Sequence, residues 1–363
     1  MPSNIIDATI LATIVYFDVL EIPVTSYEIL KHLVRKSNIK NQISKINYKD
    51  ILYTLENSKT LNNFIEERNG FYFLKGRENL IKQRIERQKI ADEKWKKVRR
   101  IARWFQIIPY LRMAAVSGSL AFNNTHKDSD LDLLIVVKSG RIWLTRVLVS
   151  GLCELLGVRR RNFDKTAPDK ICLNHYITDE SLKIPHESLY NAQTYARLVP
   201  VVNQILNIYH SPSQPPCQGN EFHCKNQKYI SKIKNLDSTI YTEFQKENQW
   251  VKNYLEFWPE AKLGNFKTLK PNIFLKIFAK IGELVLDNKL GDFLEKAAEK
   301  IQRRRIENDP LIYKKGGRIT IGNTQLEFHP DSPEAKIINR YNKTMLSLGM
   351  NKFIQKDSGL RRL

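Results

Sequence analysis

The sequence is poor in cysteine and has no long apolar run. Its four cysteines, which show none of the paired spacing of a disulfide framework, are Cys153, Cys172, Cys217 and Cys224. We therefore expect reduced thiols in a cytoplasmic protein. Cys217, His223 and Cys224 lack a C-x-x-C knuckle, so we do not expect them to bind zinc. No segment reaches the roughly eighteen apolar residues of a membrane span, and Asp7 interrupts the first apolar stretch, unlike a signal peptide.

Acidic residues are scarce as well. The chain has 38 Asp and Glu against 59 Lys and Arg, which gives a formal net charge of +21. Such an excess implies acidic partners, whether nucleic acid, nucleotide or a membrane surface. A solvated basic surface is the alternative, and composition does not separate the two. The 363 residues, 42% of them hydrophobic, are enough for two or three domains with their own cores.

One stretch, residues 111–137, holds residues that need a chemical explanation. Residues 113–116 are apolar and predict a strand, which ends at the small-residue turn Ser117-Gly118-Ser119. Residues 120–123 predict the first turn of a helix. A turn of glycine and serine before a helix presents free N–H groups, which suit phosphate.

A second strand is predicted at residues 130–137. Strand alternation points the carboxylates of Asp130 and Asp132 to one face of it, and the apolar side chains between them to the other. Two carboxylates on one face can share a divalent metal, and Mg²⁺ prefers carboxylate oxygen. The alternative is a solvated acidic edge, but the order of Gly-Ser, loop and Asp-x-Asp favours a metal site.

This order resembles a known signature. Gly118-Ser119, ten intervening residues and Asp130-Leu131-Asp132-Leu133 resemble the DNA polymerase beta-like nucleotidyltransferase superfamily, closest to its minimal nucleotidyltransferase branch. The resemblance covers residues 113–137 closely and extends loosely to residue 178. It implies a mixed sheet flanked by helices, with Gly118 and Ser119 holding nucleotide phosphates and Asp130 and Asp132 holding Mg²⁺.

The family usually supplies a third carboxylate from a later strand. The matching strand here, residues 170–178, contains no acid. Alternation groups Ile171, Leu173 and Ile177 on the apolar face, and leaves Cys172, Asn174 and Tyr176 on the other. The resemblance therefore puts Asn174 at the third position, where its amide can bind Mg²⁺ but cannot act as a general base. Otherwise the loop before the strand supplies the acid, from Asp164 or Asp169.

The N-terminal region predicts three helices followed by a hairpin. The helices are expected at residues 5–20, at 26–34 with Thr25 or Ser26 as cap, and at 48–57. Two strand-like runs then meet at Asn69-Gly70, a strong hairpin signal. This is the order of a winged helix, which binds DNA in many proteins. A docking module is the alternative.

Basic charge is concentrated before and after the Gly-Ser and Asp-x-Asp stretch. Residues 79–104 contain ten Lys or Arg against three acids and predict a long amphipathic helix. We expect its apolar stripe, formed by Ala91, Trp95, Val98, Ala102 and Phe105, to pack on the catalytic domain. A helix is also predicted at residues 142–156. After it, Arg160, with Arg159, Arg161 and Lys165, can neutralise a triphosphate or form a solvated loop.

The C-terminal region reads as mainly helical. Helices are predicted at residues 187–207, 243–257, 274–308 and 333–348, with an irregular loop at 211–218 and a hairpin at 318–328 turning at Gly322-Asn323. The expected fold class is α+β. The expected domains are a winged-helix-like domain (1–76), a basic linker helix (77–109), a nucleotidyltransferase core (110–185) and a mainly helical C-terminal domain (186–363).

Two functions follow from different classes. The first is an enzyme that moves a nucleoside monophosphate, most simply AMP from ATP, to a hydroxyl acceptor with release of pyrophosphate. The acceptor can be RNA, protein or a small molecule, because the resemblance concerns the donor site. The second is a nucleic-acid-binding regulator with a winged helix and a nucleotide-sensing domain. A toxin–antitoxin pair that modifies its partner protein is a third candidate.

Overall fold

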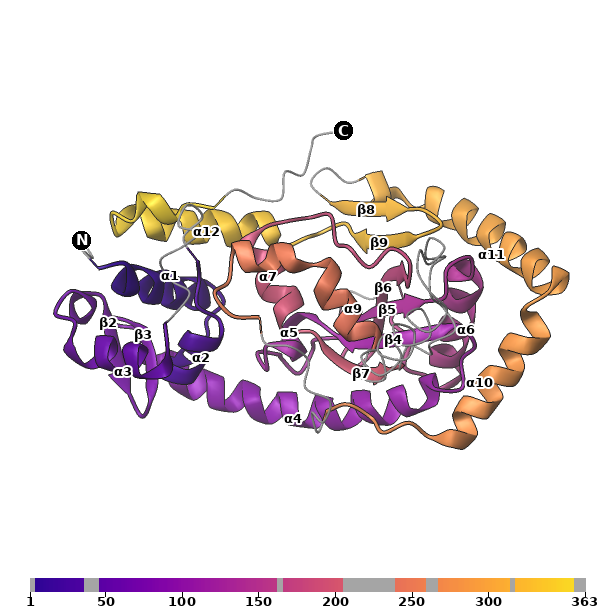
Figure 1. The fold of residues 1–363 in the computed structure, drawn as a ribbon, viewed down its shortest axis with the longest axis horizontal. Helices are drawn as coiled ribbons and strands as arrows, with labels where there is room; N and C mark the ends of the chain where they lie inside the picture. The colour runs from indigo at the N-terminus through magenta and orange to yellow at the C-terminus, as the bar shows by residue number, and fades with distance from the viewer. Residues whose placement is uncertain are drawn as a thin grey trace, which may run out of the picture.

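The computed structural model describes residues 4–35, 46–161, 166–204, 239–258, 267–313 and 317–355. The fold is α+β, as predicted, and is built around one mixed sheet of six strands (Figure 1). Several expected features lie outside the described residues, namely the loop at 211–218, the group Cys217, His223 and Cys224, and the residues Asp164 and Lys165. No described helix combines the length and the apolar character needed to cross a bilayer.

The strand order in the six-stranded sheet is β7-β4-β5-β6-β9-β8. The strands are β4 (Leu111–Val116), β5 (Leu131–Val137), β6 (Ile171–Thr178), β7 (Val199–Asn203), β8 (Arg318–Ile321) and β9 (Gln325–His329). β5 and β6 are parallel and are connected through helix α6 (Ile142–Leu155), while all other pairs are antiparallel. A parallel pair needs such a crossover, because a tight turn cannot join its ends.

The N-terminal region has the predicted three helices and hairpin. The elements are α1 (Ile5–Val19), β1 (Val24–Thr25), α2 (Ser26–Lys31), α3 (Tyr48–Asn57), β2 (Ile65–Arg68) and β3 (Phe71–Leu74). Thr25 caps α2 through a reciprocal bond with Glu28, which confirms one of the two predicted caps. Asn69 and Gly70 both have positive φ, as a two-residue hairpin turn requires.

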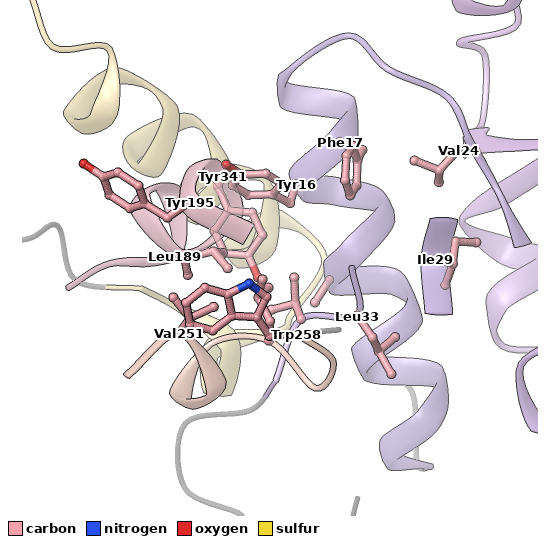
Figure 2. Packing of buried hydrophobic residues seen from close by; sticks show 14 of the residues in the cluster. Tyr16, Phe17, Val24, Ile29, Leu33, Leu189, Tyr195, Val251, Trp258 and Tyr341 are labelled. Atoms are coloured by element: carbon pink, nitrogen blue, oxygen red, sulfur yellow. The ribbon is translucent and has the colours of Figure 1, made fainter. Parts of the chain in front are cut away.

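The sheet lies between two apolar cores. One face packs against α4 (Asn79–Phe105), whose five predicted stripe residues are all buried, and against α6. The other face shares a core with the N-terminal helices, α7 (Leu189–Ala196), α9 (Ile240–Glu247) and α12 (Glu334–Ser347). In Figure 2, Tyr16 of α1 lies beside Tyr341 of α12, with ring centroids 6.2 Å apart. The N-terminal region and the C-terminal helix α12 therefore share one apolar core.

The C-terminal region departs from the prediction. The helix expected at 187–207 ends at Ala196, and residues 199–203 form β7, because the β-branched residues Val199, Val201 and Val202 suit an edge strand paired with β4. The helix expected at 243–257 is α9 followed by the 3₁₀ helix η2 (Gln249–Asn253). The hairpin at Gly322-Asn323 is confirmed, and β9 pairs with β6. The strands before and after the domain boundary expected between residues 185 and 186 therefore belong to one sheet.

The long helix expected at residues 274–308 is two helices. They are α10 (Ile273–Leu286) and α11 (Lys289–Glu307). The Asn288 side chain accepts hydrogen bonds from the N–H groups of Leu290 and Gly291, and thereby caps α11. An asparagine cap with extended backbone breaks an otherwise continuous helical periodicity, so the two segments take different directions (Figure 1).

Candidate active site

A cleft of about 1430 Å³ lies beside the first residues of β5 and β6 in the central sheet. Its walls come from the turn after β4, the first residues of β5, the strand β6, the helices α6, α7 and α11, and the segment after β9. All six site residues predicted from the sequence line it: Gly118, Ser119, Asp130, Asp132, Arg160 and Asn174. Residues that are up to 56 positions apart in the chain are therefore brought to one cavity.

The acid pair lies as strand alternation predicts. Asp130 precedes β5 and Asp132 is its second residue, and both are partly exposed in the cleft. Leu131, Leu133 and Ile135 are buried in the core on the opposite face. The backbone of β5 holds the turn after β4 in place, because the Ser117 N–H donates to the Asp132 carbonyl at 3.0 Å. The carboxylates thus stand at the start of β5, beside the Gly-Ser turn.

Gly118 is required by this close approach. Its φ is +60°, in the left-handed region that favours glycine. A Cβ added at this position would lie 2.3 Å from Oδ2 of Asp132. The absence of a side chain at residue 118 therefore lets the Asp132 carboxylate lie directly against the turn.

The third side chain at the acid pair is Cys172. Cys172 is in register with Asp132 across the parallel strands, and its Sγ lies within 4.8 Å of a carboxylate oxygen of each aspartate. Burial, and next the charge of Asp130, raise the pKa of Asp132 to about 7. Burial also raises the pKa of the Cys172 thiol, which stays protonated near neutral pH. A bound cation would favour the ionised form of Asp132, which burial and the charge of Asp130 oppose.

Arg160 supplies the positive charge in this structure. Its Nη1 donates to Oδ2 of Asp130 and lies 3.8 Å from Sγ of Cys172. Its neighbours Arg159 and Arg161 form ion pairs with Glu154 of α6. Of these three arginines, Arg160 alone is seen to bond the acid pair. A ligand with phosphate groups would compete with Asp130 for it.

Asn174 lines the cleft with the acid pair, but it is not the residue in register with Asp132. The β5–β6 pairing shifts register after Asp132, so that Leu133 of β5 faces two residues, Leu173 and Asn174. The alternation of β6 is reversed beyond this bulge. Tyr176 therefore shares a core with Ile171, and Ile177 belongs to the other core, so the predicted grouping is wrong. The Asn174 amide lies instead 3.2 Å from Nδ1 of His329.

The remaining acid considered for the third position is Asp169. Its carboxylate accepts hydrogen bonds from Nζ of Lys94, at 2.9 Å, and from Nζ of Lys97. Both lysines belong to α4, so Asp169 joins the basic helix to the loop before β6. These bonds lower the pKa of Asp169, although its partial burial opposes them. Asp169 therefore serves the packing of α4 in this structure.

A buried polar cluster forms another wall of the cleft and was not predicted. Glu327 of β9 accepts from Nε of Arg318 at 2.6 Å and lies 3.6 Å from Nε2 of His329. His175, Glu327 and His329 offer three possible metal ligands within 4.8 Å of one another. Arg318 already gives Glu327 a cation, and burial lowers the pKa of His329 to about 3, which keeps its imidazole neutral. The residues come from β6 and from a hairpin 140 positions later, so no local sequence signal joins them.

Comparisons with family models, with curated proteins and with solved structures find no match to this chain.

Proposed function

We propose that the protein is a Mg²⁺-dependent nucleotidyltransferase, which moves a nucleoside monophosphate, most simply AMP from ATP, to a hydroxyl acceptor and releases pyrophosphate. One observation carries the proposal. Two carboxylates, one with its pKa raised to about 7, stand at the start of one strand against a glycine turn in a large cleft. Crowded acids of this kind favour a divalent cation and its triphosphate ligand.

The donor set fits Mg²⁺, a hard cation that takes oxygen ligands. Asp130 and Asp132 would hold it, and Cys172 would not, because thiol sulfur suits softer metals. When bound, Mg²⁺ neutralises the triphosphate and orients its α-phosphorus for in-line attack. Gly118 and Ser119 line the same cleft, and their N–H groups would bind phosphate oxygens. Arg160 would exchange its bond with Asp130 for one with the triphosphate.

Few groups at the site can remove the proton of an acceptor hydroxyl. Neither Cys172, whose thiol pKa is raised, nor the amide of Asn174 can take the proton of an acceptor hydroxyl. Among the described residues at the acid pair, only the two metal-holding aspartates can accept one. We therefore propose a slow enzyme, in which the proton of the acceptor hydroxyl would pass to Asp132.

The position of the transferred phosphorus tests this proposal. The full chain is incubated with Mg²⁺ and each nucleoside triphosphate, labelled at the α- or at the γ-phosphate, with cell RNA or cell protein as acceptor. The expected result is transfer of the α-label with release of pyrophosphate, lost in Asp130→Asn and Asp132→Asn and kept in Asp128→Asn, an exposed acid of the same loop. Transfer of the γ-label would instead indicate a kinase-like reaction.

A second candidate function rests on the N-terminal region. Its element order α1-β1-α2-α3-β2-β3 and its sheet order β1-β3-β2 support the proposal of a winged helix. Tyr27, Tyr48 and Tyr53 are exposed on α2 and α3, where such a domain would contact a duplex. If it binds DNA, affinity should fall by about 0.9 log unit per phosphate contact for each log unit of salt. Binding that is absent at low salt would leave the region as a docking module.

A further inference from the structure

Helix α10 is attached to the body of the protein through its polar and small side chains. Glu283, which is 9% exposed, accepts from the Tyr110 N–H at 3.0 Å and from Nη1 of Arg112 at 2.7 Å. Gly282 lies against Pro109, whose Cγ would be 2.5 Å from an added Cβ. An amphipathic helix in a globular protein normally buries its apolar face. Here the buried face is the polar one.

The apolar face of α10 points outward. Its side chains recur at helical spacing and are 49–71% exposed: Ile273 69%, Phe274 71%, Ile277 49%, Phe278 59%, Ile281 50%, Leu284 68% and Val285 56%. Three residues of α11 have similar exposure, namely Leu290 53%, Phe293 67% and Ile301 70%. We call these ten residues the outer stripe. The two helices form the outer edge of the molecule at the end away from the N-terminal region (Figure 1).

Most charges of α10 and α11 are sorted by side. Four acids bond to the body: Glu283 to Arg112, Asp287 to Lys138, Asp292 to Arg141, and Glu295 to the N–H groups of Trp143 and Leu144. Of the other two, Glu299 pairs with Arg303 on the same helix, and Glu307 is exposed at the end of α11. The exposed side carries cations, which are Lys280, Lys289, Lys296, Lys300, Arg304 and Arg305. The face that is free to meet a partner is therefore both apolar and basic.

We propose that the outer stripe binds the surface of a membrane that contains anionic lipid. Helices with an apolar face and a basic polar face lie in the plane of the bilayer, where Phe and Leu enter the acyl boundary and Lys meets acidic headgroups. The 14 residues of α10 are too few to span a bilayer. This inference does not depend on the proposed catalytic activity.

Two other occupants fit the surface less well. A second copy of the chain would bring the same lysines and arginines together, and like charges at an interface oppose association. A nucleic acid would satisfy the cations but would leave the ten apolar side chains without partners. An anionic bilayer satisfies both the apolar and the basic character of the surface.

Membrane binding would also locate the cleft. Ile301 belongs to the outer stripe and lines the cleft, and Gln302 and Arg305 of the same helix line it too. A lipid surface under α11 would therefore lie beside the cleft entrance. The acid pair would then work close to the headgroup layer.

Co-sedimentation with vesicles tests the proposal. The full chain is mixed with vesicles of phosphatidylcholine alone or with phosphatidylglycerol, at low and high salt. We expect binding to the anionic vesicles that weakens with salt. The double substitution Phe274→Glu with Phe278→Glu should reduce it by about tenfold or more, and Lys280→Glu with Lys289→Glu should reduce it as well. Leu155→Glu, at an 87% exposed residue of α6, is the matched control and should bind like the wild type.

Three results would overturn the proposal. They are no binding to anionic vesicles, binding that the double phenylalanine substitution leaves unchanged, and a loss of binding in the Leu155→Glu control as large as that in the double variant. Sedimentation velocity without lipid provides a further outcome. A dimer that dissociates on Phe278→Glu would identify a second copy as the occupant. Because the substituted phenylalanines are exposed, melting curves like that of the wild type are expected, and transfer activity measured without vesicles should not change.

Discussion

Replacement of Gly118 by alanine separates backbone strain from damage to the acid pair. The residue has φ of +60°, and a left-handed alanine costs about 1–2 kcal/mol of folding free energy. The new Cβ would lie 2.3 Å from Oδ2 of Asp132, whereas ordinary contact begins at 3.4 Å. The carboxylate must therefore move by about 1 Å, which is comparable to the misplacement that costs about 10²-fold in catalysis.

Gly140 provides the matched control for this substitution. Its φ is +72°, and no described atom lies within 4 Å of an added Cβ. Gly140→Ala should therefore lose about the same 1–2 kcal/mol in urea unfolding without affecting nucleotide binding. Gly118→Ala should lose that stability and also bind ATP with Mg²⁺ about 10²-fold more weakly in isothermal titration calorimetry. Equal ATP affinity in the two variants would refute the assignment of Asp132 to a metal.

Three further predictions concern protonation and the third position. The pKa of Asp132 is raised to about 7, so a proton on this carboxyl competes with a bound metal. The affinity for Mg²⁺ should therefore fall about tenfold from about pH 8 to about pH 6. An affinity that is constant over this range would contradict the raised pKa of Asp132. Cys172→Asp should raise the affinity for Mg²⁺ and the rate of transfer, because Cys172 is the residue in register with Asp132. Asn174→Asp should change both quantities less. The opposite order would assign Asn174 to the position of the third metal-binding side chain. Burial holds the pKa of His32 well below 6.5, so the folded protein keeps this imidazole neutral. The unfolded chain binds a proton there below about pH 6.5, and the free energy of unfolding therefore falls as the pH decreases. This decrease should amount to about 2 kcal/mol between about pH 8 and about pH 5, and urea titrations of His32→Gln should show a pH dependence that is weaker by this amount.

Local patterns in the sequence predict the parts of the site that depend on a few neighbouring residues. Strand alternation is enough to put Asp130 and Asp132 on one face, and Gly118 marks the turn that must approach them. The Asn69-Gly70 turn fixes its hairpin in the same way. In each case the period of the element and the allowed φ of one or two residues determine the outcome.

Features that depend on distant pairing are not visible in the sequence. The bulge opposite Leu133 shifts Asn174 out of the register that strand alternation predicts, and only the pairing of β5 with β6 reveals it. The strand β7 begins only two residues after α7 ends, and the spacing of the apolar residues there does not distinguish a helix from a strand until β4 pairs with it. The apolar side of α10 would be predicted to face inward, but Glu283 finds its partners on the body and turns that side outward.

The central claim is that Asp130 and Asp132 together hold a divalent metal with a nucleoside triphosphate. Electron paramagnetic resonance of Mn²⁺ in place of Mg²⁺, titrated into the full chain with ATP, measures this directly. We predict that the wild type and Asp128→Asn bind Mn²⁺ in an ATP-dependent manner, and that Asp130→Asn and Asp132→Asn, still folded by thermal melting, do not. Equal ATP-dependent Mn²⁺ binding in all four proteins would contradict the claim.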